Sequence, residues 1–345
     1  MNKTAQILGS IAAAALLIAG CATRVALDVP APAAADQSYR LPATYPMPPD
    51  NVGTPARVEL GKVLFFDARL SGSGQMACVH CHFPHLAWTD GKKLPILPNG
   101  DVVPRNSPTI VNLAYNTQFT WEGRKKSLED HAYGPHRHLS RADFAAATVR
   151  LREIPGYKSM FAAAYPGEPI TEELISKALA AFQRTVVSND SPFDRWLAGD
   201  TTAMTPEQYR GFKVFNDPAK GNCASCHSGP NFTDNGFHNI GIAAPAGKQP
   251  DLGRFNLVKV AAMKGAFKTP TLRDVELTAP YYHDGSVATL REVVDHYARG
   301  GDDRSNVSPE VRKLDLTEQD KQDLVAFMRA LTGRQTAFVP PQMPQ

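Results

Sequence analysis

The chain has 345 residues, with 37 Lys and Arg, 34 Asp and Glu, and a formal net charge of +3 at pH 7. This near balance excludes the strongly basic composition that is typical of nucleic-acid-binding proteins, so we expect no nucleic acid as a partner. The part of the chain beyond residue 50 is long enough for two domains of ordinary size.

The N-terminal segment has the plan of a secretory signal. Lys3 precedes a short apolar stretch from Ile7 to Ile18, which is too short to span a bilayer. The stretch leads to Cys21 and resembles a bacterial lipoprotein signal, so we predict a signal peptide over 1–21 that ends at a lipidated Cys21. Ordinary cleavage nearby, which would leave a soluble protein, is the alternative. Either route predicts an exported, periplasmic protein whose one membrane attachment is the lipid anchor.

Residues 22–50 are rich in alanine and proline and show no sustained apolar period, which is typical of a tether. Helix signals follow, in which a threonine cap opens an apolar stripe at helical spacing. They predict helices over 54–65, 171–182, 205–215, 289–297 and 317–331. No alternating run of strand length competes with them, so we predict a mostly α fold.

Two segments carry the pattern C-x-x-C-H, to which haem is joined covalently. They are Cys78-Val79-His80-Cys81-His82 and Cys223-Ala224-Ser225-Cys226-His227. Two cysteines one turn apart can take the two vinyl groups of one porphyrin, and the adjoining histidine is placed to bind the iron. We therefore predict two c-type haems. A zinc site is the alternative for paired C-x-x-C, but a histidine directly after both pairs favours haem.

The folded part reads as one unit used twice. The similar helices over 54–65 and 205–215 each lead into one of the two motifs. We therefore expect a cytochrome c-like helical domain over 51–200, a second one over 201–336, and a short tail over 337–345. Four of the five cysteines belong to the motifs, which leaves none for a structural disulfide. Export fits this prediction, because bacteria attach haem covalently outside the cytoplasmic membrane.

Several longer blocks surround the two motifs. They are LGKVLFFDARLS at 60–71, RNSPT at 105–109, TWEGR at 120–124, KTPTLR at 268–273 and LTAPYYHDGS at 277–286. In this order the blocks resemble the bacterial di-haem cytochrome c peroxidase and MauG family. The resemblance extends over about residues 54–333.

The resemblance implies roles for individual residues. His82 would be the proximal ligand of the peroxidatic haem, and His227 that of a second haem that stores or relays an electron. Trp121 falls where the family keeps a tryptophan between the two haems, with a buried core tryptophan as the alternative. The family also implies a calcium ion between the domains, held mainly by carbonyl oxygens, which suit a hard cation. The matching positions are Asn106, Thr278 and Pro280.

The helix over 289–297 bears on the sixth ligand of the second haem. Peroxidases of the family place a methionine in this helix, whereas MauG-like members place a tyrosine. Tyr297 shares the apolar face of the helix, so we predict it as the ligand. A phenolate stabilises ferric iron and lowers the haem potential, whereas a thioether raises it. His296 and Met263 are the rival ligands, and a tyrosine of the core is the other alternative.

The distal pocket of the first haem departs from the family. Members supply a glutamate and a glutamine for proton transfer to and from peroxide, but here Arg141 stands at the glutamate position and His131 at the glutamine position. One hypothesis is that a histidine acts as base while an arginine stabilises the developing negative charge. A second is that a histidine binds the iron and closes the haem. A third is that these are surface residues of a loop.

Two functions therefore remain open. The first is an oxidoreductase that reacts with hydrogen peroxide at the His82 haem and draws electrons through the His227 haem and Trp121. Its electrons would come from a small redox protein, as in the peroxidases, or from an oxidisable protein substrate, as with MauG; a homodimer is one assembly to expect. The second is a non-catalytic di-haem electron-transfer cytochrome, which the missing distal glutamate supports.

Overall fold

The computed structural model describes residues 28–132, 144–335 and 337–345. Its α-helices are α1 (Pro55–Phe66), α3 (Phe144–Glu153), α4 (Pro155–Ala164), α5 (Glu172–Arg184), α6 (Pro192–Leu197), α7 (Pro206–Asn216), α8 (Phe255–Val258), α9 (Leu290–Arg299) and α10 (Glu318–Ala330). Two strands of two residues each, β1 (Phe237–His238) and β2 (Phe267–Lys268), pair antiparallel. The prediction of a mostly α fold is confirmed, and the strands were missed because two residues show no alternation.

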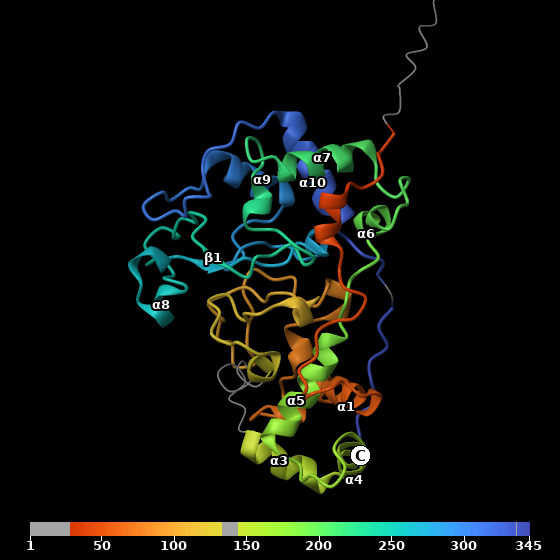
Figure 1. Cartoon of the computed structure of the whole chain (residues 1–345). Helices are drawn as coiled ribbons and strands as arrows, with labels where there is room; N and C mark the ends of the chain where they lie inside the picture. The colour runs from red at the N-terminus through yellow and green to blue at the C-terminus, as the bar shows by residue number, and fades with distance from the viewer. Residues whose placement is uncertain (1–27, 133–143, 336) are drawn as a thin grey trace, which may run out of the picture.

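The chain folds around two hydrophobic cores. The first core is built from buried residues between Leu60 and Val186, contributed largely by α1, α4 and α5. The second contains residues from Phe193 to Leu331, with α6, α7, α9 and α10 around a cluster of phenylalanines. Figure 1 shows the two groups of helices as the lower and upper halves of the molecule. Phe193 already belongs to the second core, slightly before the predicted boundary at residue 200.

The five predicted helices form because threonine caps their first turns. Thr54, Thr171, Thr205, Thr289 and Thr317 each accept a hydrogen bond from the backbone amide three residues later. Such a cap satisfies one of the amides that a helix leaves without a partner at its start. All five predicted helices are confirmed, whereas α3, α4, α6 and α8 were not predicted.

Each half contains a tight crossing of two helices at a glycine, and the two crossings are alike. Gly61 on α1 lies against Ala178 on α5, and a β-carbon at Gly61 would overlap the Ala178 carbonyl oxygen. In the second half, Gly211 on α7 has the same relation to the carbonyl oxygen of Asp323 on α10. Only glycine permits such a close approach of two backbones. The repeat seen in the sequence therefore corresponds to a repeated packing contact.

We expect Gly61→Ala and Gly211→Ala each to lower the free energy of unfolding by roughly 2–4 kcal/mol, because the added methyl group forces two packed helices apart. Guanidinium unfolding of the holoprotein, followed by circular dichroism, measures this change. Gly53→Ala is the matched control, since the nearest atom to its new β-carbon is 3.5 Å away. Losses as small as that of the control would contradict the proposed backbone contact.

Each end of the chain packs on the half that is more distant in sequence: the N-terminal segment packs on the second half and the C-terminal tail on the first. Residues 22–50 are expected to form a tether, but their described part contains a 3-10 helix, Ala34–Tyr39, and buries Val29 and Tyr39 in the second core. Tyr39 donates a hydrogen bond to the Asn216 side chain, at 2.6 Å. A single buried aromatic residue leaves no periodic signal, so the composition of the segment hid this contact.

The C-terminal tail returns to the first core. Phe338 stacks on Phe66, with ring centroids 5.2 Å apart, and Met343 packs on the same core. The backbone amide of Gly156 donates to the carbonyl oxygen of Gln345, at 3.0 Å. In Figure 1 the C-terminal segment descends from the upper half to its end beside α4.

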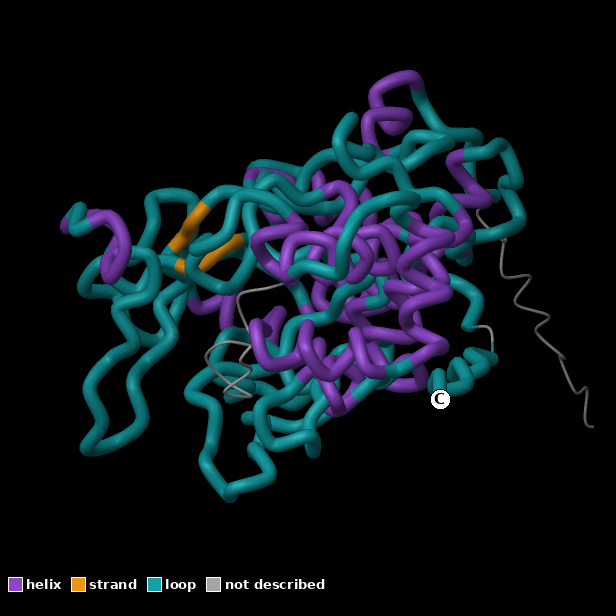
Figure 2. Tube along the Cα trace, turned by 90° about the horizontal axis from the view of Figure 1, so that it is seen from below, coloured by secondary structure: helices purple, strands orange, loops and turns teal. Residues whose placement is uncertain are grey.

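Long loops occupy the region where the two halves meet. Figure 2 shows most of the helices gathered centrally, whereas loops, the two short strands and the short helix α8 extend to one side. Arg105 from the first half forms ion pairs with Glu122 and, at 2.7 Å, with Asp251 from the second half. None of the helices that the structure describes has the length and apolarity needed to cross a bilayer.

Candidate functional site

Both C-x-x-C-H motifs begin with a short 3-10 turn, Cys78–His80 in the first half and Cys223–Ser225 in the second. The backbone amide of His82 donates to the Cys78 carbonyl oxygen, at 3.1 Å, and that of His227 to the Cys223 carbonyl oxygen, at 2.9 Å. These bonds wrap each motif into a single turn. The two cysteines and the histidine of each motif are thereby held together, as thioether attachment and iron binding require.

The two motif histidines are held in the same way. Nδ1 of His82 lies 3.0 Å from the Trp88 carbonyl oxygen, and Nδ1 of His227 lies 2.9 Å from the Phe232 carbonyl oxygen. A carbonyl partner places the proton on Nδ1 and leaves Nε2 free for a metal. Burial lowers the pKa of His82, and it lowers the pKa of His227 to about 4. Both imidazoles are therefore neutral at physiological pH, which is the form that binds iron.

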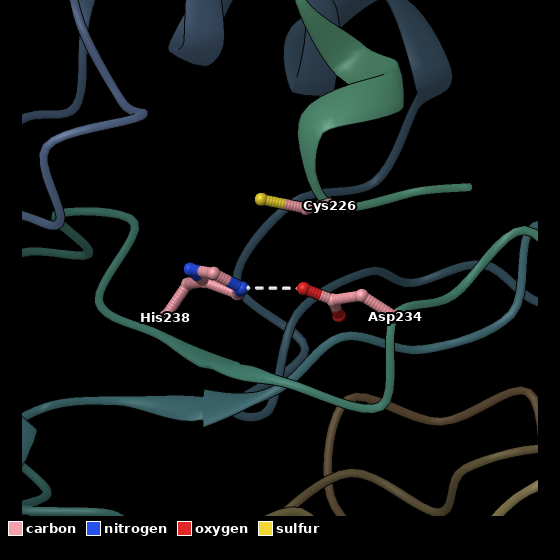
Figure 3. A group of neighbouring side chains, drawn as sticks. All are labelled: Cys226, Asp234 and His238. Atoms are coloured by element: carbon pink, nitrogen blue, oxygen red, sulfur yellow. Dashed lines mark hydrogen bonds and ion pairs between the residues drawn. The ribbon is translucent and has the colours of Figure 1, made fainter.

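The surroundings of the motif cysteines bear on the zinc alternative. Burial raises the pKa of Cys81 to about 11 and that of Cys223 to about 12. Within the described parts of the chain, one group of three candidate metal ligands occurs, formed by Cys226, Asp234 and His238. Figure 3 shows this group, which uses one motif cysteine and not a motif pair. These observations favour the predicted haem over the zinc alternative.

His238 and Asp234 of this group form an ion pair. Nε2 of His238 lies 2.8 Å from Oδ2 of Asp234, as the dashed line in Figure 3 marks. The hydrogen bond to Asp234, followed by one to Cys226, raises the pKa of His238 to about 10. The Asp234 carboxylate and the protonated His238 imidazole therefore balance each other's charge beside Cys226 of the second motif.

One cavity of about 760 Å³ joins the two motifs. This volume lies within the range of cofactor and ligand cavities in proteins. Residues from both halves line it, among them Cys81, His82, Trp121, His131, Cys223, Cys226, His227 and Tyr297. Of the described residues that were expected to attach haem, to bind its iron and to relay electrons, all but Cys78 are thus brought together around one space.

Trp121 is hydrogen-bonded to both halves at this cavity. Its indole Nε1–H donates to the Asn106 carbonyl oxygen, at 2.8 Å, in the first half. Its own carbonyl oxygen accepts from the backbone amide of Lys268, at 2.7 Å, in the second half. The first bond holds the indole and the second holds the backbone of Trp121 where the two halves meet, and the relay role of Trp121 stays a prediction.

The three residues matched to a calcium site also border the cavity. The Asn106 side-chain amide donates to the Lys92 carbonyl oxygen, at 2.9 Å, which leaves Oδ1 of Asn106 as an acceptor on that side chain. Thr278 and Pro280 contribute backbone carbonyl groups in the same region. Oxygen donors of this kind suit a calcium ion, and the calcium site stays a prediction.

Tyr297 on α9 lines the cavity, whereas neither of its two rivals is among the lining residues. Both ring nitrogens of His296 are engaged elsewhere, Nδ1 with Asp302 at 3.0 Å and Nε2 with the Ile240 carbonyl oxygen at 2.8 Å. Met263 lies in a separate 3-10 turn, Ala261–Met263. Burial raises the pKa of Tyr297, so its phenol needs the charge of a metal to ionise.

His131 lies in a helical turn, residues 128–132, and lines the cavity on the side of the first motif. Its ring stacks on Phe119, with centroids 5.5 Å apart, and its Nδ1 is buried without a hydrogen-bond partner among the described residues. Burial, with a smaller contribution from the nearby His82, lowers the pKa of His131 to about 4. Arg141, the other predicted distal residue, lies outside the described residues.

Sequence reasoning missed Gln118. Its side-chain Oε1 is buried without a partner in the described structure, and the residue lines the same cavity as His131. Three positions separate it from Trp121, but no periodic pattern distinguishes such a residue from a loop glutamine. Only the fold shows that a polar atom with unused bonding capacity borders the cavity.

Comparison with known proteins places these features in context. The family model described as "Di-haem cytochrome c peroxidase" matches residues 55–202. The methylamine utilization protein MauG of Methylophilus methylotrophus is 41% identical over 313 residues, which cover 90% of this chain and 92% of that protein. The cytochrome c551 peroxidase of Nitrosomonas europaea is 34% identical over 88% of each chain.

A solved structure gives the same result. The crystal structure of a MauG-like protein associated with microbial copper homeostasis superposes with a TM-score of 0.78 at 34% sequence identity. The superposition covers 85% of this chain and 95% of that one. Similarity therefore extends beyond residues 55–202, which the family model matches.

Proposed function

This chain belongs to the di-haem cytochrome c peroxidase family, and from that premise we propose that it reduces hydrogen peroxide at the haem of His82. Membership makes the protein a di-haem oxidoreductase of the peroxidase type, for which the family implies two c-type haems. The observation that carries the proposal is the single cavity that both motif histidines, Trp121 and Tyr297 line.

Two c-type haems, when bound, supply one iron that reacts with peroxide and another that exchanges electrons. The chain would contribute His82 and His227 as iron ligands, since a backbone carbonyl group holds Nδ1 of each imidazole and thereby directs the other ring nitrogen to the metal. Apolar side chains such as Ile110, Leu113 and Phe119 line part of the cavity. Reduction of hydrogen peroxide to two waters consumes two electrons and two protons, so the chain must also move protons and electrons.

His131 is our candidate for proton transfer. A neutral imidazole can take a proton from one oxygen of peroxide and return it to the departing oxygen. Its low pKa keeps His131 neutral at physiological pH, and its lining of the same cavity as His82 supports a role at that haem. Arg141 would add a positive charge that stabilises the developing negative oxygen.

Trp121 and Tyr297 are our candidates for electron transfer. Trp121 is hydrogen-bonded to both halves, and an indole can be oxidised briefly, so it would relay electrons between the motifs. Tyr297 would be the second axial ligand at His227 and would lower the potential there. A low potential favours the MauG manner, in which a protein side chain supplies the electrons, over supply from a small redox protein.

The cellular setting follows from the sequence predictions. We propose a periplasmic location, with lipid on Cys21 as the membrane attachment; Cys21 lies outside the described residues. We also propose that each core, with its motif, is a cytochrome c-like domain that carries one covalent haem. Calcium at Asn106, Thr278 and Pro280 would join the halves beside Trp121, and a homodimer stays a prediction.

Electron paramagnetic resonance of the ferric protein tests the proposed function. We expect a high-spin signal from the haem of His82, because one axial position must stay open for peroxide, and a low-spin signal from the haem of His227. A few equivalents of hydrogen peroxide are expected to abolish the high-spin signal. Addition of buffer without peroxide to the same sample is the control.

The alternative function has a different signature. An electron-transfer cytochrome has two irons that are both closed by protein ligands, and hence two low-spin signals that are indifferent to peroxide. That outcome would contradict the proposal of peroxide chemistry. The absence of the family glutamate favours this alternative, whereas the unpartnered Nδ1 of His131, within reach of the cavity, favours the enzyme.

A further inference from the structure

Lys268 is a partly buried cation that lines the cavity. It lies on β2 and borders the space that both motifs line. Its Nζ donates one hydrogen bond, to the Thr269 carbonyl oxygen at 2.7 Å. An ammonium group has three protons to donate, so Lys268 has bonding capacity left inside the protein.

No carboxylate of the described residues forms an ion pair with Lys268. The carboxylate whose charge acts on its pKa is that of Asp234, which raises it. That carboxylate is already engaged by His238 at 2.8 Å and by the backbone amide of Gly236 at 2.8 Å. Figure 3 shows the Asp234 side chain turned toward His238.

Other cations near the junction have partners. Arg105 is paired with Glu122 and Asp251, and Arg273, in the same sequence block as Lys268, is paired with Asp194 at 2.9 Å. An unpaired charge within a protein is expensive. Burial accordingly lowers the pKa of Lys268 to about 8. A bound anion would restore the charge and remove this penalty.

We propose that Lys268 binds a propionate carboxylate of the haem held by His227. The inference rests on the proposed two-haem function, because the haem supplies the anion. Lys268 pairs with Phe237 of β1 in the small sheet, and the next residue of β1, His238, has a ring nitrogen within 4.8 Å of the sulfur of Cys226 in the second motif. The second haem is therefore the one whose carboxylate it meets.

The backbone of Lys268 gives this contact a second consequence. Its amide donates to the Trp121 carbonyl oxygen, at 2.7 Å. One residue thus holds the carboxylate with its side chain and the relay tryptophan with its backbone. Lys268 is a positioning residue in this arrangement, since it sets the place of the second haem relative to Trp121.

The test is the reduction potential of each haem, measured by spectroelectrochemical titration of the holoprotein. A positive charge near iron favours the ferrous state, so Lys268→Met is expected to lower the potential of the second haem and to leave the first nearly unchanged. Lys268→Arg keeps the charge and is expected to stay close to wild type. Lys264→Met, which removes an exposed lysine from the same loop, is the matched control.

Three outcomes would overturn the inference. They are unchanged potentials in Lys268→Met, a shift confined to the haem of His82, and a shift in Lys268→Arg as large as in Lys268→Met. If Lys268→Met does not fold, Lys268→Gln replaces it in the same comparison. Wild-type protein that holds two haems but ignores peroxide would refute the proposed function alone, because the potentials do not depend on peroxide.

Discussion

His131→Ala is expected to lower the second-order rate constant for the reaction of the ferric protein with hydrogen peroxide by about 10²–10⁴-fold. The variant lacks the imidazole that takes up and returns the proton of peroxide. Stopped-flow absorbance in the haem bands measures the rate constant. Added imidazole is expected to restore part of the rate, because the lost side chain leaves space for it beside Phe119.

The pH dependence of the same reaction follows from the pKa of His131, which burial lowers to about 4. The imidazole is neutral, and active as a base, at every pH well above that value. The wild-type rate constant is therefore expected to be flat between about pH 5 and pH 8 and to fall as the pH approaches 4. An unperturbed histidine would instead lose activity near pH 6.5.

His85→Ala is the matched control, because His85 is an exposed histidine just after the first motif. We expect its rate constant to equal that of the wild type. A wild-type rate in His131→Ala would contradict proton transfer by His131. Conversion of a low-spin ferric signal into a high-spin one in that variant would identify His131 as an iron ligand, and hence support the electron-transfer alternative.

Tyr297→Met is expected to raise the reduction potential of the haem held by His227 and to change its low-spin ferric signal. A thioether favours ferrous iron, whereas the phenolate that it replaces stabilises ferric iron. Tyr297→Phe, which offers no ligand, is expected to turn the low-spin signal into a high-spin one. Electron paramagnetic resonance and a potentiometric titration measure these changes.

Met263→Leu is the control for this assignment, because Met263 was a rival ligand and its turn lies apart from the cavity lining. We expect its spectrum and potentials to match those of the wild type. If Tyr297→Phe kept the wild-type low-spin signal while Met263→Leu lost it, methionine would be the ligand and the potential of the second haem would be high.

Short stretches of sequence were enough to predict the chemistry of attachment and most of the helices. The C-x-x-C-H pattern works at this level because the two thioether bonds and the axial ligand all come from one helical turn. The same holds for the threonine caps, where one side chain satisfies an amide three residues away. These interactions are local, so their partners can be counted along the chain.

Other features depend on residues that are distant in sequence. The helical period of the sequence placed Tyr297 on an apolar face. His296 is disfavoured as a haem ligand because its Nε2 is bonded to the Ile240 carbonyl oxygen, 56 positions away. The position of Tyr39 in the second core also depends on a distant residue, since its hydroxyl is hydrogen-bonded to Asn216, 177 positions away. No periodicity records such contacts.

Lys268 shows most clearly which features of the site the sequence alone does not predict. Its sequence block is part of the family resemblance, yet a lysine in a loop is ordinarily solvated or paired with an acid. Whether this one lacks an acid depends on where the fold places Asp234 and His238, whose side chains meet each other at 2.8 Å. Local bonding and spacing therefore decide which cofactor the chain can hold, whereas burial and long-range pairing decide which charges are left free to bind it.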